Sequence, residues 1–392
     1  MRVVSDSERR ARLARRHALA PASKAATAED ATRALTVLHA TEPATVYLSL
    51  FARVDGLEIA DVDRALFTDR TLVKQLAMRR TLFVFPRDLL PAVLPGASAR
   101  VAATERARMA KDVVAVGIAS DGNEWLDRAR AEVLAVLEQH PEGLTAAEIR
   151  VAVPTIDVKV ESPGGEAWAA PRILIHLGLT GDLIRGTNTG HWRTSRPRLA
   201  RTRDWLGSDI RSQDAATGYR EIVRRWLYSF GPGTEDDLVW WLGATKGIVR
   251  AALAELGAVA VNLEHGAVGY LLPDDLDEVT DPGLWAALLP VLDPTVMGWK
   301  ERGFYLGPHS DALFERRGNA GTTAWVNGRV VGCWVQDATA AVHLSLLENV
   351  TGDERSALET EARRLTAWLA GERVGTGYVS PAMKAAYAAL QL

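Results

Sequence analysis

The feature that most constrains the fold of this chain is a pattern of segments that occurs twice. Each copy has a helical segment, a glycine-containing turn, a Thr that can cap a second helix, a third helical segment and a possible β-hairpin. In the first copy Glu148 follows Thr145 at the spacing of a capping box. In the second copy Thr234 and Asp237 begin the equivalent helix. The copies lie about 90 residues apart, so they are repeated modules and not the short units of a solenoid.

The order of elements in each copy is that of a winged helix, a helix-turn-helix followed by a β-hairpin called the wing. For the first copy the sequence predicts helices over 125–139, from Thr145 and over 168–177, an irregular stretch around Pro154, Pro163, Gly164 and Gly165, and a hairpin over 183–194 that turns at Asn188–Gly190. For the second copy it predicts helices over 219–230, 235–242 and 246–256, and strands over 259–263 and 268–272.

The N-terminal part of the chain predicts a further winged helix with additional helices. Residues 58–76 carry apolar side chains at helical spacing, interrupted at 68–70, and residues 79–85 have the composition of a strand that stops at Pro86. Residues 98–113 predict a basic helix. Residues 7–19 predict an exposed basic helix, whose charged face is either solvated or in contact with phosphate.

The C-terminal part has a different pattern. Residues 289–294, 323–326, 329–335 and 341–346 predict short strands, and Asn327-Gly328 is a hairpin turn. Residues 353–371 predict an amphipathic helix. The expected fold class is therefore α+β, with three tandem winged-helix modules and a small β-barrel-like domain. The expected domains are 1–120, 121–205, 206–280 and 281–392.

Composition excludes several classes of protein. A chain of 392 residues is long enough for two to four domains, and its net charge of −3 argues against a uniformly basic nucleic-acid coat. The single cysteine, Cys333, excludes an internal disulfide and a cysteine-based zinc cluster. The first residues lack the apolar core of a signal peptide, and no apolar run approaches the roughly 20 residues of a membrane helix. We expect a soluble cytoplasmic protein.

The candidate catalytic residues are His39 and Thr41, which flank the small residue Ala40 just before Pro43. A helix that begins near Asp30 should end here, because proline disfavours the helical conformation for the residue before it. Where the chain leaves a helix, alternate side chains can face the same way, so His39 and Thr41 can point into one pocket.

Six arginines and no acidic residue occur between Arg185 and Arg203, over the second wing and the linker that follows it. The run is either a solvated loop or a surface for a nucleic-acid backbone, and the mutual repulsion of the six charges favours the second. Lys300, Arg302, Arg316 and Arg317 can extend this surface. Together with tandem winged helices, the run favours DNA over a small molecule as the partner.

Four segments, in this order, resemble the winged-helix family of AlkZ/YcaQ-like DNA glycosylases over nearly the whole chain. They are Leu38–Pro43 with the following Val46–Arg53, Arg80–Leu89, Leu289–Pro294 with Trp299–Arg302, and Arg329–Gly332. The resemblance implies a C-shaped protein around duplex DNA that hydrolyses the N-glycosidic bond of alkylated or bulky purines, without cofactor or metal. It also implies that residues 39 and 41 position the attacking water, although the family has Q-x-Q or Q-x-D where this chain has His39 and Thr41.

The chemistry remains possible with this pair. An N7- or N3-alkylated purine is already cationic and leaves without a general acid, so the site must hold a water against C1′ and stabilise an oxocarbenium-like sugar. Neutral His39 can accept a proton from that water, and the Thr41 hydroxyl can orient it. Asp293 is either the carboxylate of this site or a turn residue before Pro294. His39 can instead cap helix carbonyls, and Glu42 is expected to be solvated or structural.

The expected partner is therefore double-stranded DNA with damaged purines, and we expect a nucleoid-associated monomer with no obligate protein partner. The alternative is a winged-helix DNA-binding protein without catalysis, such as a damage sensor or regulator. A metal hydrolase is disfavoured because the eight histidines show no metal-ligand spacing. The candidate DNA contacts are Arg79, Arg80, Arg185, Arg193, Arg196, Arg198, Arg201, Trp299, Lys300, Arg302 and Arg316.

Overall fold

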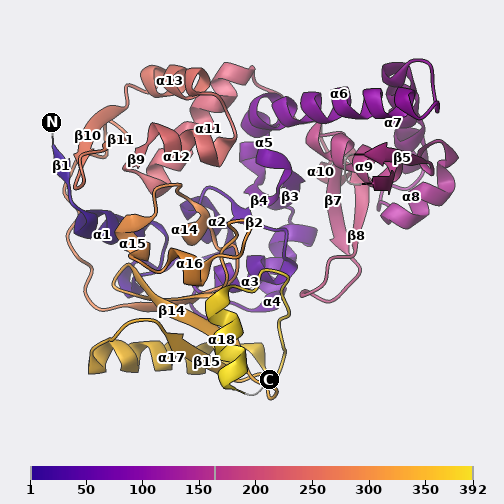
Figure 1. The fold of residues 1–392 in the computed structure, drawn as a ribbon. Helices are drawn as coiled ribbons and strands as arrows, with labels where there is room; N and C mark the ends of the chain where they lie inside the picture. The colour runs from indigo at the N-terminus through magenta and orange to yellow at the C-terminus, as the bar shows by residue number, and fades with distance from the viewer. Residues whose placement is uncertain (1, 163–164, 391–392) are drawn as a thin grey trace. The chain divides into compact units, whose positions relative to one another are not determined.

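The capped helices expected at the two threonines are present in the computed structural model, which describes residues 2–162 and 165–390 (Figure 1). Thr145 caps α8 (Ala146–Ala152) and Thr234 caps α12 (Glu235–Leu242), and both have the complete capping box. The chain divides into two compact units, one of residues 1–62 and 223–392 and one of residues 63–222. Each unit is described by itself below.

The unit of residues 63–222 combines helices with four neighbouring antiparallel strands in the order β4-β3-β7-β8. Its strands and helices are β3 (Leu72–Leu76), β4 (Leu82–Pro86), α5 (Leu90–Val93), α6 (Ala99–Ala115), α7 (Gly122–Glu138), α8, β5 (Lys159–Ser162), β6 (Gly165–Trp168), α9 (Ala169–Leu179), β7 (Leu183–Asn188), β8 (Pro197–Arg201) and α10 (Thr202–Leu206). Its single-turn elements are the π-helices η2 (Arg64–Thr68) and η5 (Leu94–Ser98) and the 3₁₀ helices η3 (Met78–Arg80), η4 (Arg87–Leu89) and η6 (Pro154–Ile156). A core from α6 to β7 that includes Trp125, Val133 and Leu177 holds the helices together.

Several predictions for this unit are confirmed and two are wrong. α6, α7 and α9 match their predicted helices to within a few residues, and β7 matches the first strand of the hairpin predicted over 183–194, whereas its partner β8 lies beyond that range. The hairpin turn is longer than expected, since β8 begins only at Pro197. Residues 72–76 form a strand and not the end of a helix, and part of the expected irregular stretch is the hairpin β5–β6. Pro163 and Gly164 lie outside the described residues.

The other unit contains two sheets and a set of short helices. Its elements are β1 (Val3–Val4), α1 (Asp6–Arg16), η1 (Pro21–Ser23), α2 (Ala28–Ala34), β2 (Leu38–His39), α3 (Pro43–Phe51), β9 (Gly233–Thr234), α12, α13 (Lys246–Glu255), β10 (Val259–Leu263), β11 (Val268–Leu271), β12 (Ala286–Leu289), α14 (Pro294–Met297), α15 (Gly303–Leu306), α16 (Ser310–Leu313), β13 (Thr323–Val326), β14 (Arg329–Gln336), β15 (Val342–Leu346), α17 (Gly352–Leu369) and α18 (Pro381–Ala389). The chain passes between the units within α4 (Ile59–Asp63) and α11 (Ala215–Phe230).

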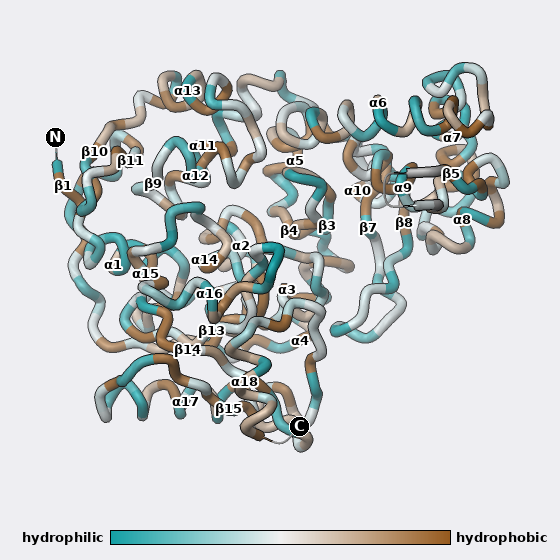
Figure 2. Tube along the Cα trace, viewed as in Figure 1, coloured by the Kyte–Doolittle hydropathy of each residue, from teal (hydrophilic) through white to brown (hydrophobic). Residues whose placement is uncertain are grey.

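The C-terminal sheet has the antiparallel order β12-β13-β14-β15. The predicted strands over 323–326, 329–335 and 341–346 are confirmed, whereas most of residues 289–294 is a turn that leads into α14. Asn327 (φ 48°) and Gly328 (φ 79°) both have left-handed backbone, as a tight hairpin between β13 and β14 requires. β14 is apolar along most of its length, and α17 alternates apolar and polar residues (Figure 2). Among the described residues the four strands form an open sheet and not a closed barrel.

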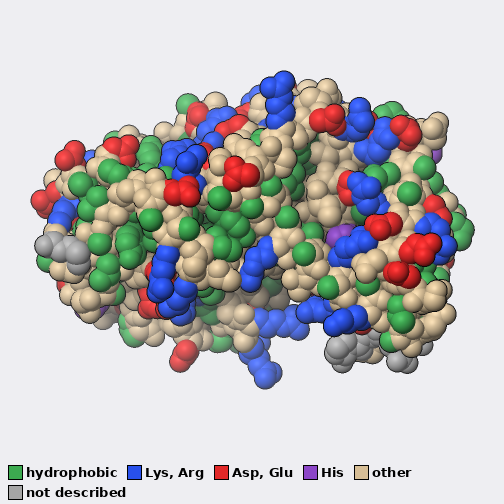
Figure 3. Space-filling model, turned by 90° about the horizontal axis from the view of Figure 1, so that it is seen from above, with side chains coloured by type: hydrophobic (Ala, Val, Ile, Leu, Met, Phe, Trp, Pro, Cys, Tyr) green, Lys and Arg blue, Asp and Glu red, His purple; other side chains and the backbone are tan. Residues whose placement is uncertain are grey.

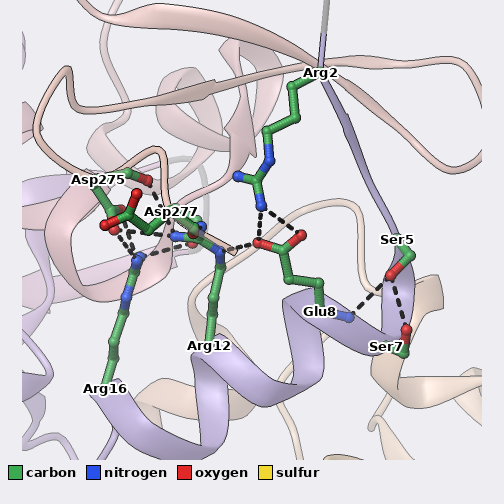
Figure 4. A network of polar contacts seen from close by, with 9 residues as sticks. Arg2, Ser5, Ser7, Glu8, Arg12, Arg16, Asp275 and Asp277 are labelled. Atoms are coloured by element: carbon green, nitrogen blue, oxygen red, sulfur yellow. Dashed lines mark hydrogen bonds and ion pairs between the residues drawn. The ribbon is translucent and has the colours of Figure 1, made fainter. Parts of the chain in front are cut away.

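The N-terminal helix α1 is not the exposed basic helix that its composition predicted. Arg9 and Arg12 are buried, and Arg12 donates to Glu8 at 2.8 Å, to the Asp275 carboxylate at 3.1 Å and to the Asp277 carbonyl (Figure 4). Arg16 donates to the Asp275 carboxylate at 2.6 Å. Glu8 of the same helix and Asp275, which is far away in the sequence, therefore compensate the charges of Arg12 and Arg16, and these two arginines are not available to phosphate.

Candidate active site

His39 and Thr41 lie in a short connection between a strand and a helix. β2 ends at His39, and α3 begins at Pro43. Glu42, the residue before the proline, has φ −94° and ψ 118°, the extended conformation that a following proline favours. We call residues 38–42 the His–Thr turn. The predicted approach by a helix is wrong, because α2 already ends at Ala34.

The two candidate side chains of the His–Thr turn belong to residues in direct contact. The backbone N–H of Thr41 donates to Nδ1 of His39 over 3.4 Å. Ala40 between them is buried, whereas Thr41 is exposed and His39 is half-buried. This alternation places His39 and Thr41 toward solvent and Ala40 toward the protein. A neutral imidazole that accepts at Nδ1 carries its proton on Nε2.

A strained residue anchors the chain just before the His–Thr turn. Thr36 is fully buried and has φ 64°, a left-handed conformation that is costly for a β-branched residue. Its hydroxyl donates to the carbonyl of Arg225 at 3.1 Å and lies 2.9 Å from the hydroxyl of Ser229, both in α11. These contacts hold the strained backbone between the end of α2 at Ala34 and the turn.

Helix α3, which follows the turn, is attached to the segment after β12. The hydroxyl of Thr45 donates to the carbonyl of Val291 at 2.9 Å, and the hydroxyl of Ser49 donates to Asp293 at 2.6 Å. All three polar side chains of this contact are buried. The first residues of α3 therefore hold a fixed position relative to residues 291–293.

Asp293 forms a buried ion pair with Arg53, and both side chains are 0% exposed. Arg53 donates to the two carboxylate oxygens at 2.7 and 2.9 Å, and the backbone N–H of Thr295 donates at 2.9 Å. Together with Ser49, these donors occupy both oxygens of Asp293, which is also the N-cap of α14. The structure therefore places this candidate carboxylate inside the protein, where its charge is already compensated.

His17 extends this buried polar cluster. Its Nδ1 lies 2.8 Å from the hydroxyl of Thr295, and its Nε2 lies 3.1 Å from the carbonyl of Ser229. Burial, with a smaller contribution from the Arg53 charge, holds the pKa of His17 well below its ordinary value. The imidazole also stacks on Trp299 at 5.7 Å. Trp299 is buried and donates to a backbone carbonyl, so its side chain offers DNA no surface.

The β7–β8 hairpin carries two arginines for which the described residues provide no acidic partner. Arg196 is exposed in the connection between β7 and β8, and Arg185 lies on β7 beside Lys74 of β3. Burial lowers the pKa of Arg185 and lowers that of Lys74 to about 8. Arg193, close to His191, is half-buried on the same hairpin. This hairpin therefore presents net positive charge.

Other arginines of the same run are neutralised within the protein. Arg198 donates to the carbonyl of Gly143 and lies 3.7 Å from Glu142. Arg201 pairs with Asp204 at 2.5 Å and with Glu138 at 2.9 Å, which raises its pKa. The run contains no acidic residue in its sequence, but in the folded protein acidic residues from outside the run lie beside it. On the face drawn in Figure 3, acidic side chains likewise lie among the basic ones.

The turn between β3 and β4 presents Arg79 and Arg80 in left-handed backbone, with φ values of 55° and 59°. Both are exposed, and Arg80 pairs with Glu105 at 2.9 Å. Asn and Gly are the usual residues for such a turn, because they tolerate positive φ. Two consecutive arginines with this backbone conformation are costly.

Of the remaining candidates, Lys300 and Arg316 are exposed, and Arg302 is half-buried. Lys300 lies 3.6 Å from Asp236. The Arg302 guanidinium lies 4.5 Å from the ring of Phe314 and donates to a backbone carbonyl. Within residues 2–162 and 165–390, no cluster of three His, Cys, Asp or Glu side chains could hold a metal ion. No helix in the same residues is long and apolar enough to span a membrane.

Sequence reasoning missed Arg53 and Ser49, which connect α3 to Asp293. Both belong to the segment that follows Pro43, and their spacing of four residues would place them on one face of a helix. That spacing is a weak signal, because their partner lies 240 residues away in the sequence.

This chain belongs to a family of DNA glycosylases. The model of the family described as "DNA glycosylase AlkZ-like" matches residues 32–368, which include the His–Thr turn, Asp293 and the basic hairpin. The resemblance of the four sequence segments to this family is therefore confirmed.

A solved structure supports the fold. The DNA glycosylase AlkZ of Streptomyces sahachiroi superposes with a TM-score of 0.75 at 20% sequence identity, and the match covers 95% of this chain and 98% of that chain. No curated protein matches the sequence. The family and the mixed α+β fold are thus established, while the assignment of winged helices within it stays a prediction.

Proposed function

We propose that this protein is a monofunctional DNA glycosylase that hydrolyses the N-glycosidic bond of alkylated or bulky-adduct purines in duplex DNA. The observation that carries the proposal is the His–Thr turn, in which His39 and Thr41 face solvent side by side on a firmly anchored backbone. Membership of the DNA glycosylase AlkZ-like family supplies the reaction class. Base excision repair is the process that such a reaction serves.

The proposed reaction needs a positioned water more than a strong acid. In an N7-alkylated guanine the base is cationic, so the C1′–N9 bond breaks with its electron pair moving to the base, which departs neutral. The water oxygen then bonds to C1′ of the oxocarbenium-like sugar and loses a proton. The product is an abasic sugar with a hydroxyl at C1′. Holding the water in line is therefore the principal task of the protein.

His39 and Thr41 divide that task. The Thr41 hydroxyl accepts a hydrogen bond from the water and orients it. Nδ1 of His39 takes the proton of the water. At 3.4 Å the hydrogen bond from the Thr41 N–H to Nδ1 is long and weak, so a water can replace it. Asp293 contributes by fixing α3 through Ser49 and Arg53, and it does not touch the reacting atoms in this account.

We assign DNA binding chiefly to Arg196, which is exposed, and to the half-buried Arg185, both on the hairpin. Arg185 and Lys74 lie on neighbouring strands, and the desolvation of both favours a polyanion beside them. Arg79 and Arg80 present two further cations on a strained turn. Arg193, Lys300 and Arg316 are additional contacts, while Arg198, Arg201 and Arg302 act mainly within the protein.

The test is an excision assay on duplexes that contain N7-methylguanine or a bulkier N7-alkylpurine. Abasic sites are revealed by alkaline cleavage, and His39→Ala and Thr41→Ala are assayed beside the wild type. The proposal predicts abasic product for the wild type and a loss of about 100-fold or more for His39→Ala, as for the removal of a general base. A wild-type protein that binds these duplexes but yields no product would contradict it.

A non-catalytic DNA-binding protein is the second candidate, because His39 and Thr41 stand where the resembling family has Q-x-Q or Q-x-D. This candidate predicts that His39→Ala changes neither DNA affinity nor any product yield. The same assay therefore separates the two functions.

A further inference from the structure

The His–Thr turn contains one carboxylate, that of Glu42, which the reaction described above does not use. Glu42 is the N-cap of α3, yet its side chain makes no capping hydrogen bond to that helix. Its Oε1 instead accepts a hydrogen bond from the backbone N–H of Gly377 at 3.1 Å, and the hydroxyl of Thr376 lies at 3.5 Å. These two residues are more than 300 positions later in the sequence. A residue of the His–Thr turn is thus tied to the C-terminal part of the chain.

Residues 371–380, which we call the C-terminal strap, connect α17 to α18. Gln336 of β14 holds the start of the strap, since its side chain accepts from the backbone N–H of Val374 at 2.8 Å and donates to the carbonyl of Glu372 at 3.0 Å. Gln336 itself is 4% exposed. The strap ends at the fully buried Ser380, which caps α18. Gly377 therefore donates from a segment that is fixed at both ends.

The direction of the Glu42 side chain separates it from the reacting pair. His39 and Thr41 face solvent, whereas the hydrogen bond from the Gly377 N–H directs the Glu42 carboxylate toward the C-terminal strap. Glu42 also lines a small cavity of about 20 Å³, together with Thr45 and Gln336. Glu42 thus points toward the strap and the cavity.

We propose that Glu42 is a positioning residue, which holds the His–Thr turn in its reactive position by binding the C-terminal strap. Thr36 anchors the chain before the turn and Thr45 anchors α3 after it, so Glu42 supplies the attachment of the turn itself. Displacement of a catalytic group by about 1 Å can reduce a rate by about 100-fold. The inference rests on the proposed glycosylase function.

The experiment separates the length of the side chain from its charge. Single-turnover excision of N7-methylguanine and DNA affinity are measured for the wild type, Glu42→Ala, Glu42→Gln and Glu42→Asp. Gln keeps an acceptor oxygen at the same reach, whereas Asp keeps the charge but is one methylene too short to reach Gly377. We therefore expect Glu42→Gln to retain the rate within about threefold, and Glu42→Ala and Glu42→Asp to lose about 10- to 100-fold with unchanged affinity.

The matched control is Gly377→Ala, which keeps the donating N–H. Its added Cβ would lie 3.7 Å from Glu42 Oε1, an ordinary contact, so the wild-type rate is expected. A fast Glu42→Asp with a slow Glu42→Gln would overturn the inference, because the charge and not the attachment would then matter. An unchanged rate in Glu42→Ala would also overturn it. If Glu42→Ala does not fold, the Gln and Asp variants still decide the question. Absence of wild-type excision would instead refute the proposed function.

Discussion

Removal of the Asp293 carboxylate should destabilise the protein strongly, because it leaves a buried cation without its partner. In Asp293→Ala, Arg53 loses two hydrogen bonds of 2.7 and 2.9 Å while its side chain stays 0% exposed. Ser49 and the Thr295 backbone lose their acceptor as well. Breaking a buried ion pair from one side costs about 3–5 kcal/mol. Since a whole domain is stable by about 5–15 kcal/mol, this loss is a large fraction of the total.

The measurement is urea unfolding followed by tryptophan fluorescence, with the free energy of unfolding obtained by linear extrapolation. Glu235→Gln is the control, since it weakens an ion pair with Arg250, whose side chain is 66% exposed, and should shift the midpoint far less. The double variant Arg53→Met/Asp293→Leu should regain most of the stability, because it removes both charges. An Asp293→Ala midpoint as close to the wild type as that of Glu235→Gln would refute the reasoning.

Three further predictions concern other charged groups. Because the pKa of His17 is held well below its ordinary value of about 6.5, the unfolded chain binds a proton there more readily than the native state. The contribution of His17 to stability is present above about pH 6.5 and falls by up to about 1.4 kcal/mol per pH unit as the pH drops below that value. Urea unfolding at pH 7.5 and 5.5 should therefore show a weaker pH dependence of stability in His17→Gln than in the wild type. An equal pH dependence in the two proteins would contradict this prediction. Arg196→Gln should weaken duplex binding and reduce the slope of log K against log salt by about 0.9, whereas Arg250→Gln, a paired arginine, should not. Arg79→Gly should relieve about 1–2 kcal/mol of left-handed strain while lowering DNA affinity, and a lower melting temperature would show that the turn is not strained.

Local signals in the sequence predicted many elements of the fold. The capping residues Thr145 and Thr234 marked the starts of α8 and α12, and Asn327-Gly328 marked the turn between β13 and β14. Each of these signals depends on residues within one turn of the chain. Residues 72–76 were misassigned because apolar residues at 72, 73 and 76 fit both helical and strand spacing, and pairing with β4 decides between them.

The candidate site was predictable only in part. The position of His39 and Thr41 before Pro43 located the turn, but their contact and their exposure required the structure. The burial of Asp293 depends on Arg53, far away in the sequence, and no spacing rule connects the two. Similarly, acidic groups outside the run of arginines neutralise Arg201, so counting the charges in that run overestimated the surface available to DNA.

The most direct test of the central claim is the single-turnover rate of N7-methylguanine excision by wild type and His39→Ala, with protein in excess of duplex and DNA affinity measured in parallel. We predict that the wild type forms abasic sites and that His39→Ala binds the same duplex equally well but forms them at least about 100-fold more slowly. Equal rates in the two proteins would show that His39 does not act on the water, and a wild type that binds without excising would contradict catalysis itself.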